Sequence, residues 1–146
     1  MPTAGKLFGA ISFALVAWFV SGLIPPLLPE GVPTPLLQPV NAVVGFIMGW
    51  TILGRNAGDG LVAALGHAST TAVAVVFWCL VIWSGDEMIE RATRLFYDGP
   101  VEALQDMATV ALEYGRMVAT IEIIGALVIG TVASALLTEG AAARWT

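Results

Sequence analysis

Three side chains could do chemistry on their own within the apolar parts of this 146-residue chain, namely Glu122, Cys79 and His67. An acid buried in a membrane is a default candidate for moving protons, a cysteine can act as a redox thiol, and a histidine can bind a metal. The chain has one cysteine and one histidine, so neither has the second thiol or imidazole that disulfides and most metal sites require. We interpret His67 as a hydrogen-bonded structural residue and Cys79 as a small hydrophobic residue.

Glu122 is the one acid within a long apolar run, and it lies near the start of that run. Asn41 and Arg116 should lie near the same membrane face, so Glu122, Asn41 and Arg116 form a candidate intramembrane polar site. This site could be a structural hydrogen bond or ion pair, a proton-linked group, or a carboxylate that reaches the interface. His67 should lie toward the opposite face, so it is not expected to meet Glu122.

Motifs of catalysis and cofactor binding are missing from the sequence. There is no Walker loop, no G-x-G-x-x-G, no Cys/His ligand pair and no nucleophile–base–acid set. Residues 54–60 (GRNAGDG) are glycine-rich but lack the lysine of a phosphate-binding loop. We therefore expect no enzymatic activity, no cofactor and no metal.

The composition indicates a membrane protein. Hydrophobic residues make up 58% of the chain and charged residues 12%, against roughly 25% charged in soluble domains. A chain this short cannot hide so much apolar surface from water, because small folds leave much of their surface exposed. The net charge of -5 argues against nucleic acid, which binds clustered lysine and arginine.

Four apolar runs predict membrane-spanning helices at about 7–24, 38–54, 61–83 and 117–138. The link at 25–39 carries six prolines and should be stiff and extended. Residues 54–60 should form a tight polar turn whose glycines are free to adopt positive φ. The sequence thus predicts an all-α, integral membrane four-helix bundle that forms one domain over residues 1–146.

An acidic stretch at about 86–116 interrupts this apolar pattern. Its first part should continue the third helix out of the membrane, with i,i+4 pairs Glu87–Arg91 and Glu90–Arg94. Gly99 and Pro100 should stop that helix and start another, with Asp98 as a candidate cap. The sequence predicts an extramembrane amphipathic helical hairpin between spans 3 and 4.

The second helix of this hairpin should have two unlike faces. One face is apolar and comprises Val101, Leu104, Ala108, Ala111 and Leu112. The opposite face carries the acids Glu102, Asp106 and Glu113. A helix on anionic lipid would normally be basic, so the apolar face should rest on the preceding arm or on another protein. The hairpin either caps its own bundle or is a docking surface, in which case the three acids are candidate partner contacts.

Small residues predict close helix packing in two spans. Gly45 and Gly49 form a GxxxG in the second span, and Gly130 and Ser134 belong to a small-residue ridge in the fourth. Such residues let helix backbones approach closely in lipid. The motif fits packing within the bundle or formation of a homodimer.

Orientation rests on the basic residues near the span ends. These are Lys6, Arg55 and Arg144 on one side, and Arg91, Arg94 and Arg116 in the acidic stretch on the other. We expect both termini in the cytoplasm and the acidic stretch on the outer face of a bacterial inner membrane.

Several segments together resemble the TrgA family of small bacterial membrane proteins, which are associated with tellurite resistance. The segments are MPTAGKL, AW in the first span, LPEG, VNA-x-x-G-x-x-x-GW running into GR-x-AG-x-G, YDGPVEAL and EYG. The resemblance covers nearly the whole chain, and its most specific parts, YDGPVEAL and EYG, fall within the acidic stretch. It implies a link to tellurite resistance and assigns no catalytic residue.

Two functions follow from these observations. The chain either supports resistance to an oxyanion, or is an accessory subunit of a larger respiratory or photosynthetic membrane complex. Direct passage of tellurite, a dianion, would need positive charge along a path, and no lysine or arginine lies within the four predicted spans. The expected partners are membrane lipid and a larger membrane complex or a second copy of the chain.

Overall fold

The computed structural model describes residues 4–27, 36–93 and 98–145, and these ranges form helices and connecting turns without a strand. The elements are α1 (Ala4–Ser21), the 3₁₀ turn η1 (Pro25–Leu27), α2 (Leu37–Met48), the π-helical η2 (Gly49–Leu53), the 3₁₀ turn η3 (Gly54–Asn56), α3 (Leu61–Thr93), α4 (Pro100–Val118) and α5 (Ile121–Trp145). Four helices are long and apolar enough to cross a membrane, namely Ala4–Ser21, Leu37–Asn56, Leu61–Thr93 and Ile121–Arg144. The all-α class and the four apolar helices of spanning length agree with the sequence prediction.

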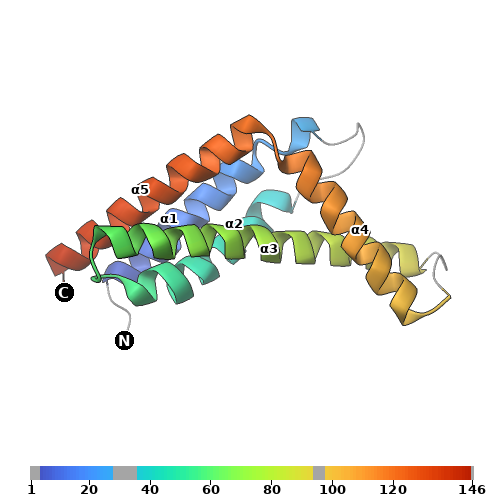
Figure 1. Cartoon of the computed structure of the whole chain (residues 1–146), viewed down its shortest axis with the longest axis horizontal. Coiled ribbons are helices and arrows are strands. Elements are labelled where there is room, and N and C mark those ends of the chain that lie inside the picture. The colour runs from blue at the N-terminus through green and yellow to red at the C-terminus, as the bar shows by residue number, and fades with distance from the viewer. Residues whose placement is uncertain (1–3, 28–35, 94–97, 146) are drawn as a thin grey trace.

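The four apolar helices pack around one another. α1 contacts α2 and α5, and α3 contacts α2 and α5 from the other side. The start of α1, the end of α5 and the turn before α3 lie at the same end of the molecule (Figure 1). From that end α3 and α5 diverge, and α4 crosses between them at the far end. The bundle is therefore narrow at one end and open at the other, where α4 bridges the opening.

The narrow end is held by a glycine seam, formed by Gly9 on α1 and by Gly45, Gly49 and Gly54 on the α2 side. A methyl group added at Gly45 would lie 2.5 Å from the carbonyl oxygen of Phe13, and one at Gly49 would overlap the carbonyl oxygen of Gly9. At Gly54 the added carbon would lie 2.5 Å from the Cα atom of Lys6. The GxxxG of the second span thus packs against α1 within the same chain, because only glycine leaves room for this approach.

Small residues also join α5 to the bundle. A methyl group added at Gly130 would lie 2.8 Å from both γ-carbons of Val16 on α1. Ser134 is 1% exposed and Thr138 is fully buried, and neither hydroxyl has a hydrogen-bond partner among the described residues. The predicted ridge therefore faces the interior of the bundle.

A glycine-containing turn between η3 and α3 closes the narrow end of the bundle. Gly58 and Gly60 adopt φ values of +104° and +101°, as predicted for this turn, whereas Gly54 has a helical φ of -67° and begins η3. The carboxylate of Glu139 on α5 accepts hydrogen bonds from the amides of Gly58 and Gly60, each 3.0 Å long. Glu139 thus fastens the end of α5 to the turn between η3 and α3.

Several boundaries differ from the sequence prediction. α1 covers Ala4–Ser21 against the predicted 7–24, and α5 continues to Trp145, past the predicted end at 138. Residues 25–27 form a 3₁₀ turn instead of an extended link, and residues 28–35 of that link lie outside the described part. The start of α2 at Leu37 is within one residue of the prediction. The apolar run predicted at 117–138 is split, because α4 ends at Val118 and α5 starts at Ile121. The Thr120 hydroxyl accepts from the amide of Ile123, as an N-cap does, so a new helix begins there.

Candidate functional site

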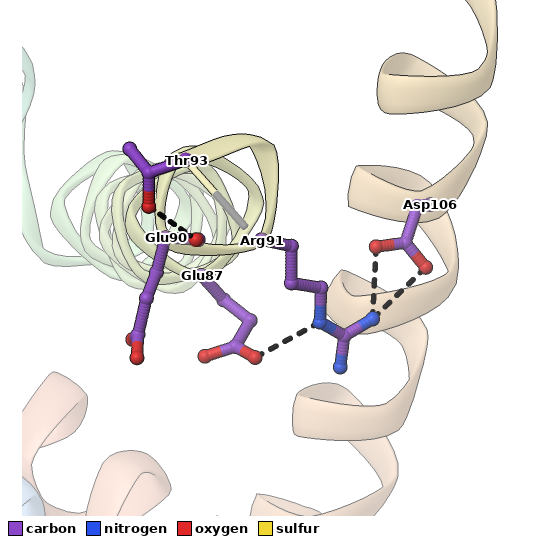
Figure 2. Close-up of polar contacts among 5 residues, drawn as sticks. All are labelled: Glu87, Glu90, Arg91, Thr93 and Asp106. Atoms are coloured by element: carbon purple, nitrogen blue, oxygen red, sulfur yellow. Dashed lines mark hydrogen bonds and ion pairs between the residues drawn. The ribbon is translucent and has the colours of Figure 1, made fainter. Parts of the chain in front are cut away.

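An ion-pair clamp joins α4 to the outer part of α3. Arg91 on α3 reaches across to Asp106 on α4, with Nη1–carboxylate oxygen distances of 2.8 and 3.0 Å (Figure 2). The Nε atom of Arg91 also donates to Glu87, one turn earlier on α3, at 2.9 Å. The predicted Glu87–Arg91 pair is confirmed, whereas the Glu90–Arg94 pair lies outside the described residues. One guanidinium thus satisfies a carboxylate on each helix.

Besides the clamp, α4 packs on α3 through a stripe of residues at heptad spacing, which we call the Val110 stripe. Val110 is 1% exposed and is the buried residue of α4. Gly85 on α3 faces Met107, whose terminal methyl would lie 3.6 Å from an added Cβ atom. The half-buried or buried positions of this stripe are Ala103, Met107, Val110, Tyr114 and Met117. Their 4-3-4-3 spacing is the sequence signal of the packed face.

The apolar face predicted for α4 points the other way. Val101, Leu104 and Leu112 are 67%, 63% and 63% exposed, and Ala108 is exposed as well, while Ala111 is half-buried. Of the two predicted contacts for this face, the preceding arm is wrong, because the Val110 stripe packs on that arm; contact with another protein stays a prediction. We call Val101, Leu104, Ala108 and Leu112 the outer stripe of α4.

The three acids predicted to dock a partner have three different environments. Asp106 belongs to the clamp, so the expectation that it is an exposed acid is wrong. Glu102 is exposed, and its carboxylate accepts a 3.1 Å hydrogen bond from the amide of Asp98. Glu102 thereby caps α4, and the side chain of Asp98 was wrongly expected to do so, because the N-cap position is Gly99 without a side-chain bond. Glu113 is exposed and lines the cavity described next.

A cavity of about 720 Å³ lies at the open end of the bundle, bordered by all five helices. Along α3 its wall is apolar from Val75 to Trp83 and becomes charged from Asp86 onward. Its remaining apolar wall includes Val20, Leu37, Val110, Ile123 and Leu127. The volume falls within the range of about 300–1,000 Å³ that is typical of small-molecule sites.

The mouth of the cavity is acidic. Among the described residues its charged lining comprises Asp86, Glu87, Glu90, Glu113 and Arg91. Figure 2 shows Glu87 and Glu90 pointing the same way from α3, while Arg91 turns toward α4. The charge of Arg91 is shared by Glu87 and Asp106, so carboxylates dominate the mouth. Burial raises the pKa of the Tyr114 hydroxyl in this wall, and the negative charge of Glu87 raises it further.

A buried polar network borders the same cavity. Asn41 on α2 is 5% exposed. Its side-chain amide donates to the hydroxyl of Ser21 on α1 at 2.9 Å, and its oxygen accepts from the indole nitrogen of Trp83 on α3 at 2.8 Å. One amide therefore ties three helices together, with its donor and acceptor both used as burial requires.

The predicted polar site of Glu122, Asn41 and Arg116 does not form among the described residues. Asn41 is committed to Ser21 and Trp83, and Arg116 is exposed near the end of α4. Glu122 is exposed in the first turn of α5, beside an apolar groove between α1 and α5. A carboxylate in the first turn of a helix is stabilised by the helix dipole, so Glu122 is accommodated although no ion pair joins it to a basic side chain among the described residues.

The two other reactive side chains are isolated from one another. Cys79 is a half-buried residue of the cavity wall. The Nε2 atom of His67 lies 3.7 Å from a carboxylate oxygen of Asp59 near the narrow end. Within the described ranges no three histidine, cysteine, aspartate or glutamate side chains gather as metal ligands would.

Four apolar helices of spanning length, with one further helix bridging the open end, define a multi-pass helical membrane protein. Comparison of the chain with protein-family models, with curated proteins and with solved structures finds no match in any of the three.

Proposed function

We propose that this protein is a non-catalytic membrane subunit that binds a larger membrane protein through the outer stripe of α4. The observation that carries the proposal is the exposure of Val101, Leu104 and Leu112 on a helix that is not one of the four apolar spans. α3 is 33 residues long, or about 50 Å, against a hydrocarbon core of about 30 Å. The end of α3, and α4 packed on it, can therefore stand outside the bilayer.

The acidic side chains beside the outer stripe favour a protein over an anionic lipid surface as its partner. On a helical projection Glu102 and Glu113 lie between the outer stripe and the face packed on α3. Anionic headgroups would be repelled by these acids, whereas a partner with an apolar groove and a basic rim would match both features. The stripe is small, so other surfaces of the chain would share in a stable complex.

The experiment is native purification in mild detergent, with one substitution on the stripe and one beside it. The parent chain should co-migrate with a larger membrane complex at constant ratio. Leu104→Asp should leave the helix content unchanged and detach the chain from that complex, because it places a charge in the apolar contact. Thr109→Asp adds the same charge at another exposed position of α4 and should stay bound.

Two results would contradict the docking proposal. One is a parent chain that purifies as a monomer or homodimer under every condition. The other is equal behaviour of Leu104→Asp and Thr109→Asp, which would mean that the outer stripe has no special part in assembly.

The resemblance to the TrgA family supports a second candidate, a role in tellurite resistance in the bacterial inner membrane. The acidic mouth of the cavity disfavours direct handling of a dianion, because in the described part of the chain four carboxylates line it and the Arg91 guanidinium is already paired. We therefore place this role in protection of the envelope or support of a transporter. Deletion of the gene followed by measurement of tellurite uptake tests it: unchanged uptake with lower tolerance is expected, and lower uptake would contradict it.

A further inference from the structure

We propose that the cavity at the open end of the bundle binds an amphipathic organic cation, with its apolar body among α1, α2, α3 and α5 and its positive group at the acidic mouth. The site lies on the inner side of α4, opposite the outer stripe, so it does not depend on the docking proposal. The class of ligand follows from three properties of the cavity: its volume, the order of apolar and charged residues along its wall, and the charge at its mouth.

The order of polarity fixes how a ligand would lie. Going outward along α3, the lining residues are Val75, Cys79 and Trp83, and then Asp86 and Glu90. The apolar part is therefore deepest, and the carboxylates come last. An amphipathic molecule would enter with its apolar part first and keep its polar group at the mouth, as pockets of this kind do.

The carboxylates at the cavity mouth determine whether the polar group of a ligand is positive or negative. An anionic head would meet the exposed carboxylates of Asp86 and Glu113. Among the described lining residues the guanidinium is that of Arg91, which is held by Glu87 and Asp106. A cation gains from each carboxylate in turn, and Trp83 and Tyr114 add aromatic rings to the wall. The ammonium group of an aminophospholipid and the charged centre of a free lipophilic cation share this chemistry.

Direct binding to the purified protein in phosphatidylcholine nanodiscs tests the proposal, with empty discs as the background. Tetraphenylphosphonium is the cationic probe, and tetraphenylborate is its anionic counterpart of matched shape. Saturable binding of the cation and none of the borate are expected. Equal binding of the two ions above background would overturn the proposal.

Two double substitutions that each remove two carboxylates test whether the mouth of the cavity causes the preference for a cation. Asp86→Asn combined with Glu113→Gln should weaken phosphonium binding about tenfold, because two carboxylates leave the mouth. Asp98→Asn combined with Glu102→Gln removes the same charge at positions that do not line the cavity, and should change affinity less than about twofold. If both pairs weaken binding equally, the effect is general surface charge and the assigned site is wrong.

The single cysteine reports occupancy without a change to the fold. Cys79 lies in the apolar wall, so bound phosphonium should slow its reaction with N-ethylmaleimide severalfold at the concentrations that saturate binding. An unchanged rate at saturation would place the cation elsewhere and overturn the proposal. Discs that contain phosphatidylethanolamine separate the two sources: competition identifies the aminolipid as occupant, and undiminished affinity identifies a free cation.

Discussion

The two ends of this small bundle are built on opposite principles. At the narrow end the glycine seam brings backbones of α1 and α2 into direct contact, and Glu139 ties the last helix to the turn. At the open end α3 and α5 diverge around a cavity of about 720 Å³, and α4 is held there by the Arg91 clamp and the Val110 stripe. Rigidity and room for a ligand are thus separated within one chain, so substitutions at the two ends should have different consequences.

The largest difference concerns the side of the membrane that each end faces. In a Cys79→Ser background, Gln105→Cys on α4 should react with a membrane-impermeant maleimide applied to right-side-out vesicles. Asn56→Cys in η3 should react only after the vesicles are permeabilised, because α3, which joins the two positions, is long and apolar enough to cross the membrane once. The reverse pattern would invert the orientation, and labelling of both from one side would contradict a single crossing by α3.

Within the seam, added volume should be poorly tolerated. Gly49→Leu should lower the free energy of unfolding by about 3 kcal/mol, because its Cβ atom would overlap the backbone of α1. Gly66→Leu on α3 is the matched control, since nothing lies within 4 Å of the added carbon there. Thermal unfolding in detergent, followed by circular dichroism, measures both. Equal melting temperatures would mean that the seam does not set stability.

At the open end, loss of the Arg91 clamp should have a small effect on overall stability and a local effect on α4. Asp106→Asn should cost about 1 kcal/mol or less, because Asp106 and Arg91 are 25% and 36% exposed and solvent screens the pair. Hydrogen exchange of the α4 amides should rise by up to about fivefold, while the α1 amides stay unchanged. Glu113→Gln is the control, because it removes an acid of α4 outside the clamp. Equal exchange in the two variants would show that the clamp does not hold α4.

The sequence predicted the narrow end better than the open end. Apolar runs of spanning length and a GxxxG pattern report directly on membrane helices and their contacts, because lipid leaves packing of small residues as the main association signal. The positive φ of Gly58 and Gly60 follows from the same local chemistry.

At the open end the sequence of α4 contains two apolar stripes, and the prediction that the outer stripe packs on α3 was wrong. α4 carries both the outer stripe and the heptad stripe around Val110, and periodicity alone does not say which of two apolar stripes is buried. The clamp decides the rotation of the helix, since it requires Asp106 to face Arg91. The pairing of Asn41 with Trp83 likewise depends on the third dimension, because the two residues lie 42 positions apart. The cavity has no local sequence signal, as its lining comes from five helices.

The two faces of α4 should differ sharply in their accessibility to a reagent in water. In the Cys79→Ser protein in nanodiscs, Leu104→Cys and Val110→Cys would each be reacted with a membrane-impermeant maleimide. Leu104 is 63% exposed and Val110 is 1% exposed, so we expect Leu104→Cys to react rapidly and Val110→Cys only after denaturation. Equal protection of both cysteines would place α4 within lipid, and faster reaction at Val110→Cys would mean that the helix is rotated. Either result would contradict an extramembrane α4 that packs by its Val110 stripe and leaves its outer stripe free.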